Sequence, residues 1–128
     1  IRDRQRFFDK LKFMPQAYEV LRKFALQDEV TIVSSGYSPN LRAKEKWCKE
    51  ILPFCHFIGV NLKEYKNKSH IDMSGSLFID DSAHNLTTSN ADTKICFGEI
   101  YSWNKEWNGK RYWDWNMIYQ TYKSELED

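Results

Sequence analysis

The sequence lacks the features that mark several classes of protein. It has only three cysteines, Cys48, Cys55 and Cys96, and no Cys-x-x-Cys pair. This pattern argues against a disulfide framework or a thiolate zinc site and predicts reduced thiols. No apolar run approaches the roughly 18 residues of a membrane span, and no signal peptide is recognisable. We therefore expect a cytoplasmic protein that does not enter a membrane.

The chain also has no excess of one charge. Lys and Arg number 19 against 18 Asp and Glu, a formal charge of +1. No strong field would draw such a chain to DNA or RNA, so nucleic acid is not the expected partner. Hydrophobic residues make up 41% of the 128 residues, which is enough for a folded core and predicts a single domain spanning 1–128.

Short apolar runs alternate with helical patterns along the chain. Strands are predicted at 30–33, 57–60, 76–79 and 93–97, and helices at 41–52, 82–89 and 113–126. Another helix is expected to begin at Pro15, with five apolar residues at helical spacing: Ala17, Val20, Leu21, Phe24 and Ala25. The charged segment 2–11 is predicted to form a further short helix. This alternation predicts an α/β fold with a parallel sheet covered by helices on both faces.

In parallel sheets the functional site lies beyond the carboxyl ends of the strands. Ser34, Ser35 and Gly36 follow the first predicted strand, where hydroxyls and backbone N–H groups could hold phosphate oxygens. The same serines could instead form ordinary local turn bonds. The segment is thus a candidate phosphate site, and its residues alone do not distinguish phosphate binding from local turn bonds.

Asp80 and Asp81 follow the strand predicted at 76–79. Adjacent carboxylates repel each other unless a cation or a proton offsets them, and Mg²⁺ suits such a site. Alternatively, Asp81 or Ser82 could cap the next helix. Lys68, in a polar loop 12 residues before Asp80, could balance both the carboxylates and a phosphate.

The order of these motifs resembles the haloacid dehalogenase-like phosphatase superfamily. The matching stretches are Phe13-Met14-Pro15, Val30-Thr31-Ile32-Val33-Ser34-Ser35, Leu52-Pro53-Phe54, Lys68-Ser69 and Leu77-Phe78-Ile79-Asp80-Asp81. Within the superfamily, the sequence is similar to the 5′(3′)-deoxyribonucleotidases (5′-nucleotidase type C), including bacterial and phage-like members. The resemblance implies a Rossmann-like sheet. It also implies Mg²⁺-dependent hydrolysis of a nucleoside monophosphate through a phosphoaspartate.

The resemblance also implies roles for individual residues. Ser34 would bind the transferring phosphoryl group, with Ser35 and Gly36 beside it. Lys68 would steady the phosphoaspartate, and Ser34, Lys68 and Asp80 are the expected catalytic residues. Asp80 and Asp81 would position the Mg²⁺ ion.

The family's Asp-x-Asp motif, which carries the nucleophile and the acid–base residue, has no counterpart predicted in this sequence. Asp3 and Asp9 have no predicted strand before them. We therefore expect the first strand and most of the cap to be missing, with 1–12 as a cap remnant. The strands before Ser34 and after Lys68 would then lack a central partner. Residues before Ile1, another segment or copy, or a rearranged sheet could fill that gap, and we expect the first.

Two other functions compete with the phosphatase. One is a pseudophosphatase that binds nucleotides or a protein partner without turnover. The other is a single-stranded nucleic-acid-binding module that uses the aromatic-rich tail at 101–128. We expect the tail's aromatic rings to pack over the sheet instead. A homodimer is left open.

Overall fold

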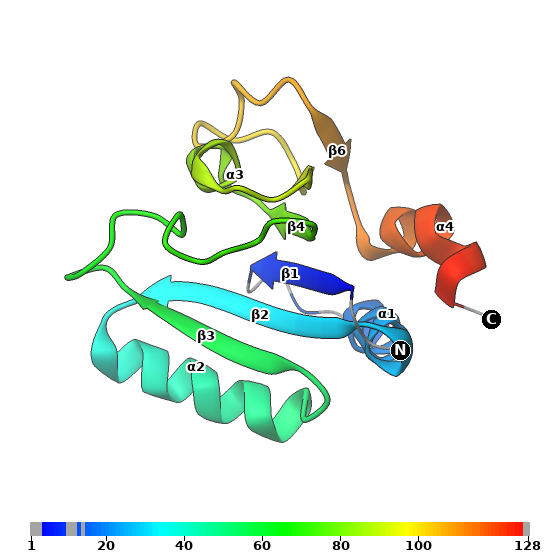
Figure 1. The fold of residues 1–128 in the computed structure, drawn as a ribbon, viewed down its shortest axis with the longest axis horizontal. Coiled ribbons are helices and arrows are strands. Elements are labelled where there is room, and N and C mark those ends of the chain that lie inside the picture. The colour runs from blue at the N-terminus through cyan, green and yellow to red at the C-terminus, as the bar shows by residue number, and fades with distance from the viewer. Residues whose placement is uncertain (1–3, 10–12, 14, 127–128) are drawn as a thin grey trace.

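The computed structural model describes residues 4–9, 13 and 15–126. Within them, six parallel strands form one sheet with the order β3-β2-β1-β4-β5-β6 (Figure 1). This confirms the predicted α/β architecture. The strands are β1 Gln5–Asp9, β2 Glu29–Gly36, β3 His56–Asn61, β4 Leu77–Asp80, β5 Thr93–Phe97 and β6 Lys110–Tyr112. The helices are α1 Pro15–Gln27, α2 Ser38–Ile51, α3 Ala83–Thr88 and α4 Trp115–Leu126.

The centre of the sheet is filled by β1, so two predictions were wrong. Segment 2–11 was predicted as a helix and 1–12 as a cap remnant, but Gln5–Asp9 is a strand that pairs in parallel with both β2 and β4. The missing central strand is therefore supplied by another segment of the chain, the second of the three options considered. Residues 1–3 and 10–12 lie outside the described residues.

The side chains of β1 explain why it is a strand. Phe7 and Phe8 are both buried, but on opposite faces of the sheet, as the alternation of a strand requires. Arg6 is also buried because its guanidinium forms an ion pair with Asp28 at 3.0 Å. A charged residue that looked like part of a solvated helix face is thus neutralised inside the molecule.

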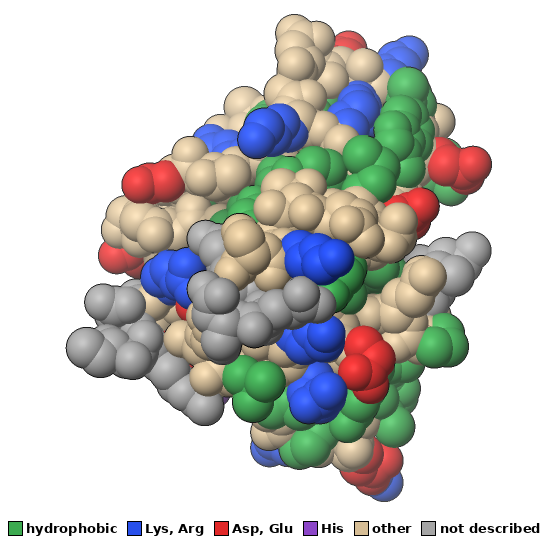
Figure 2. Space-filling view, turned by 90° about the vertical axis from the view of Figure 1, so that its right-hand side faces the viewer, with side chains coloured by type: hydrophobic (Ala, Val, Ile, Leu, Met, Phe, Trp, Pro, Cys, Tyr) green, Lys and Arg blue, Asp and Glu red, His purple; other side chains and the backbone are tan. Residues whose placement is uncertain are grey.

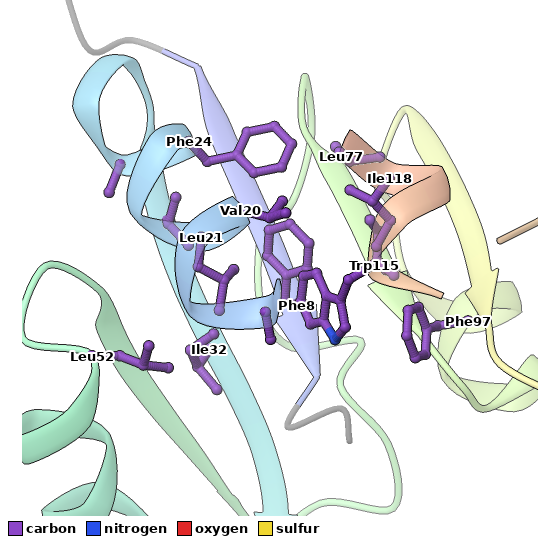
Figure 3. Packing of buried hydrophobic residues seen from close by; sticks show 14 of the residues in the cluster. Phe8, Val20, Leu21, Phe24, Ile32, Leu52, Leu77, Phe97, Trp115 and Ile118 are labelled. Carbon is purple, nitrogen blue, oxygen red and sulfur yellow. The ribbon is translucent and has the colours of Figure 1, made fainter. Parts of the chain in front are cut away.

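Two hydrophobic cores cover the two faces of the sheet. The larger core joins α1, α2 and α4 to one face, and Phe8 lies at its middle, with ring centroids 5.7 Å from Phe24 and 5.8 Å from Trp115 (Figure 3). The smaller core gathers Phe7, Phe78 and Leu86 under α3. Helices therefore cover both faces, as the sequence predicted.

Several observed element boundaries differ from the predicted ones because polar residues take part in strands and helices. Ser34, Ser35 and Gly36, predicted as loop, are the last residues of β2. Helix α2 begins at Ser38 rather than at residue 41, because Pro39 fits its first turn. Within α2, Cys48 is buried, whereas Ile51 at the end of the helix is 38% exposed. The three-residue edge strand β6 was not predicted.

One face of the described part of the chain carries mixed charge. Figure 2 shows Lys and Arg side chains scattered among Asp, Glu and hydrophobic side chains on the face that carries the C-terminal end. This mixture agrees with the formal charge of +1. Among the described residues, none of the helices combines the length and apolarity needed to cross a bilayer.

Candidate phosphate and metal site

The sheet brings the polar residues at three strand ends to one edge. Asp9 closes β1, Asp80 closes β4, and Ser34 lies near the end of β2. Asp9 stands level with Val33 in the parallel register, and the preceding Phe8 is level with Ile79. Because these strands are neighbours, their carboxyl ends form the common rim expected for a functional site.

Lys68 joins these strand ends. Its ammonium donates hydrogen bonds to Asp9 Oδ1 at 2.7 Å, Asp80 Oδ2 at 2.8 Å and the Val33 carbonyl at 3.2 Å. These three acceptors match its three donors. The side chain is only 1% exposed, and burial lowers the Lys68 pKa, but the charges of Asp9 and Asp80 outweigh this and raise it overall. Lys68 is therefore held as a cation at the centre of the rim.

Asp80 is fixed by contacts on both carboxylate oxygens. Oδ1 accepts from the Ser82 backbone N–H at 2.9 Å, and Oδ2 accepts from Lys68 and, at 3.3 Å, from the Asn85 side chain. Burial, followed by the charge of Asp9, raises the Asp80 pKa to about 7. Lys68 thus offsets only part of the negative charge around this group.

Asp81 completes a cluster that fits a metal ion. One carboxylate oxygen each from Asp9, Asp80 and Asp81 lies within 4.8 Å of the others. Three carboxylates against one ammonium leave an excess of negative charge, and oxygen ligands at this spacing suit a hard divalent cation. Burial and then the charge of Asp9 raise the Asp80 pKa, and a bound cation would oppose both effects.

Of the two residues that could cap the next helix, Ser82 does so. Its hydroxyl accepts the Asn85 backbone N–H at 3.2 Å and caps α3. Asp81 does not cap the helix, and no described residue donates a hydrogen bond to its carboxylate. The two adjacent acids therefore differ: Asp80 is held rigidly, whereas the half-buried Asp81 can accept a ligand.

The residues predicted to bind phosphate occupy the same rim. Ser34 is 1% exposed and follows Val33, whose carbonyl Lys68 contacts. The Ser35 carbonyl accepts from Lys44 at 2.8 Å, and the Gly36 carbonyl accepts from the backbone of Leu62. A Cβ at Gly36 would lie 2.7 Å from Asn40 Oδ1, so glycine allows α2 to start close to the strand end. The roles of these residues toward phosphate stay predictions.

Sequence reasoning missed three residues of the site. Asp9 was set aside because no strand was predicted before it, yet it contacts Lys68 and belongs to the acid cluster. Asn85 and Asn104 were not considered. Asn85, five residues after Asp80 and on the first turn of α3, could have been suspected from its position, but Asn104 lies in a connection with no predictable conformation.

Asn104 ties the connection between β5 and β6 to the acid pair. This fully buried side chain donates to the Asp81 carbonyl at 3.0 Å and the Glu99 carbonyl at 3.1 Å. Its own oxygen accepts from Arg111 at 3.3 Å, and Arg111 also donates to the Asn104 and Trp107 carbonyls. The backbone beside Asp81 is thereby held through two polar side chains.

Comparison with known protein families agrees with this geometry. Residues 2–124 match the family model described as 5′ nucleotidase, deoxy (pyrimidine), cytosolic type C protein. The match and the all-parallel sheet place the chain among the haloacid dehalogenase-like hydrolases. The chain is a member of the cytosolic type C 5′-nucleotidase family, and the match extends into the aromatic-rich tail as far as residue 124. No individual curated protein matches the chain.

Proposed function

We propose that this domain hydrolyses nucleoside monophosphates to a nucleoside and inorganic phosphate, and that it requires Mg²⁺. The observation that carries the proposal is the convergence of Asp9, Asp80 and Asp81 within 4.8 Å, with Lys68 bonded to two of them. Family membership supports the nucleotidase class. The arrangement suits phosphoryl transfer, in which positioning and charge stabilisation supply most of the catalysis.

Each residue has a role that its surroundings support. Bound Mg²⁺, held by the three carboxylates, would supply positive charge against the phosphate oxygens. Ser34 would donate to the phosphoryl group, and Lys68 would counter the charge that develops on its oxygens. Asp9 stands where a carboxylate nucleophile would be needed, at the end of the central strand beside Lys68.

The proposed reaction has two steps. A carboxylate oxygen attacks phosphorus as the bond from phosphorus to the nucleoside oxygen breaks, and that oxygen leaves with a proton. Water then attacks the phosphoaspartate, releases phosphate and restores the carboxylate. The sequence has Leu11 two residues after Asp9, where the family's Asp-x-Asp motif has its acid–base residue. Proton transfer would therefore have to involve water.

Leu11 also favours a second candidate, a pseudophosphatase that binds nucleotides without turnover. A residue that cannot carry a proton removes the help of general acid–base catalysis, which typically contributes about 10²–10⁴-fold. Binding to Mg²⁺ and phosphate would survive this loss, because Lys68 and the acid cluster are intact. The two candidates share one site and differ only in turnover.

Phosphate release from deoxynucleoside 5′- and 3′-monophosphates, with and without Mg²⁺, separates them. The hydrolase gives Mg²⁺-dependent release that Asp80→Asn abolishes. Glu50→Gln, an exposed acid on α2, is the matched control and leaves the rate unchanged. Nucleotide binding without release would favour the pseudophosphatase, and absence of both would remove the nucleotidase proposal.

Asp9→Asn tests the nucleophile separately. This variant keeps the shape of the side chain but cannot form the phosphoaspartate, so hydrolysis should stop while nucleotide binding continues. Hydrolysis that persists in Asp9→Asn would assign the nucleophile to another residue.

A further inference from the structure

Two aromatic side chains of the tail stack on each other at the surface. The rings of Tyr101 and Trp103 have centroids 4.5 Å apart and planes 14° from parallel. Even so, Tyr101 is 41% exposed and Trp103 is 52% exposed. A stacked pair of this kind presents a flat, rigid, apolar face to solvent instead of filling the core.

The rest of the tail behaves differently. Tyr112 and Trp115 are buried in the larger core, as we expected of the whole tail. Trp107 packs against the smaller core and donates its indole N–H to the Lys110 carbonyl. The expectation that the tail packs over the sheet therefore holds for these three residues and fails for Tyr101, Trp103 and Trp113. The exposed pair needs another explanation.

The pair belongs to a segment fastened beside the acid cluster. The Trp103 carbonyl accepts from the Ala83 N–H at 3.1 Å, two residues after Asp81. The next residue, Asn104, donates to the Asp81 carbonyl. The Tyr101 hydroxyl donates to Glu99 at 2.9 Å, and its pKa is raised chiefly by Glu99 and, least, by the charge of Asp81. The aromatic pair thus stands at the same rim as the proposed metal.

Hydrogen bonds to its backbone and to its hydroxyl hold Tyr101 in place. Asn104 Oδ1 accepts the Tyr101 backbone N–H at 2.9 Å, and the same side chain is bonded by Arg111. A platform fixed before a ligand arrives loses little conformational entropy on binding. The Tyr101–Glu99 bond also limits rotation of the phenol ring.

We propose that the Tyr101–Trp103 pair is the platform on which the nucleobase of the substrate stacks while its phosphate binds at Lys68 and the acid cluster. This assignment rests on the proposed function, because it names the part of that site which recognises the base. Every nucleobase has a π-face, so stacking gives affinity with little discrimination among bases. A phosphate ester without a base would gain nothing from the pair.

Calorimetry with uncleavable ligands tests the assignment. The ligands are a deoxynucleoside 5′-phosphonate and the matching sugar phosphonate without a base, each titrated in Mg²⁺. We expect Trp103→Ala to weaken the nucleoside ligand about tenfold and to leave the base-free ligand unchanged. Trp103→Phe should restore most of the lost affinity. Because the Trp103 side chain is exposed, replacing it should change the stability of the fold little. The backbone hydrogen bond from Ala83 to the Trp103 carbonyl does not depend on the side chain.

Trp113→Ala is the matched control. Trp113 is 48% exposed and follows β6, the edge strand farthest from β1 on that side of the sheet. Its removal should change the affinity for either ligand less than twofold. Equal losses in Trp103→Ala and Trp113→Ala would overturn the assignment, because a general surface effect would then explain both.

Other outcomes separate this inference from the proposed function. If both ligands bind wild-type protein equally, the platform is wrong while the phosphate site stands. If neither binds, the phosphate site fails and the platform falls with it. A tenfold loss in Trp103→Ala, without turnover of any natural nucleotide, would support the platform and remove hydrolysis. Tighter binding of a single-stranded oligonucleotide than of the nucleoside ligand would also overturn the assignment.

Discussion

The Lys68 ammonium lies 2.8 Å from the Asp80 carboxylate, and the two side chains are 1% and 0% exposed. Lys68 is also 2.7 Å from Asp9, so one buried cation separates two acids. Removing one partner from such a group leaves an uncompensated buried charge. The site and the stability of the sheet therefore depend on the same side chain.

Lys68→Met should lower the free energy of unfolding by about 3–5 kcal/mol at pH 8. The loss should be smaller at pH 5, because Asp80 without Lys68 would have an even higher pKa and would be protonated there. Urea unfolding at the two pH values measures both effects. Lys66→Met, at an exposed position two residues earlier, should change the unfolding free energy by less than about 0.5 kcal/mol. If Lys68→Met changed the unfolding free energy as little as Lys66→Met, the buried ion group would not contribute to stability as we expect.

The metal-free protein should lose stability as the pH rises from about 4 to about 7. Asp80 has a pKa of about 7 in the folded protein, against about 3.9 in an unfolded chain. In this window the folded state binds a proton that the unfolded state has released, so the free energy of unfolding falls by up to about 1.4 kcal/mol per pH unit. Above pH 7 both states are ionised and this contribution is constant.

Urea unfolding in EDTA between pH 4 and pH 8 checks this dependence. Asp80→Asn, which has no group to titrate, should remove the slope that Asp80 contributes. The raised Lys68 pKa adds no slope here, because Lys68 is protonated in both states throughout the window. An unchanged slope in Asp80→Asn would assign the pH dependence to other groups.

Mg²⁺ should raise the melting temperature, and more at pH 8 than at pH 5. A ligand that binds only the folded state stabilises it by mass action, by about 2.7 kcal/mol at 100 times its dissociation constant. At pH 5 a proton on Asp80 competes with the ion. Asp81→Asn should remove most of the Mg²⁺-dependent shift, because Asp81 is half-buried and, unlike Asp9 and Asp80, is not bonded to Lys68. Thermal scans with and without the metal, with Glu50→Gln as the control, measure these shifts.

Phe8→Ala should lower the free energy of unfolding by about 3–5 kcal/mol. The Phe8 ring is fully buried between α1 and Trp115 (Figure 3). Phe13→Ala is the comparison, because Phe13 is 40% exposed and contacts Trp47 at one edge. Amide hydrogen exchange adds a second measurement: the N–H groups of β1 should be among the slowest to exchange. Equal effects of the two substitutions would contradict a central β1.

The sequence predicted the elements that carry a regular pattern. The apolar spacing of α1 is a 13-residue signal, and the β-branched run before Ser34 is typical of a buried strand. It also located Lys68 and Asp80 at the rim, through the rule that functional sites lie beyond the carboxyl ends of parallel strands. The five residues of β1 show no such pattern, because Arg6 is buried by pairing with Asp28, 22 residues away. A contact so distant leaves no local trace, and the three residues of β6 are too short to show periodicity.

For the same reason, the sequence alone predicted only part of the acid cluster. Asp80 and Asp81 are adjacent and conspicuous, but Asp9 joins them only after the sheet has formed. Asn104 is likewise placed by Arg111 and by its own connection. Side chains that meet through tertiary structure cannot be grouped by spacing along the chain.

The bond between Asp9 and Lys68 spans 59 residues of chain. Strand β1 pairs with β2 and β4 and has no neighbour formed by a local hairpin, so its closure must wait for distant segments to arrive. The chemistry of this protein would then be one of the last properties to emerge during folding. A partly folded chain would then contain most of its helices and still be unable to bind ligand. The rate at which ligand binding is recovered would report the rate of the last folding step.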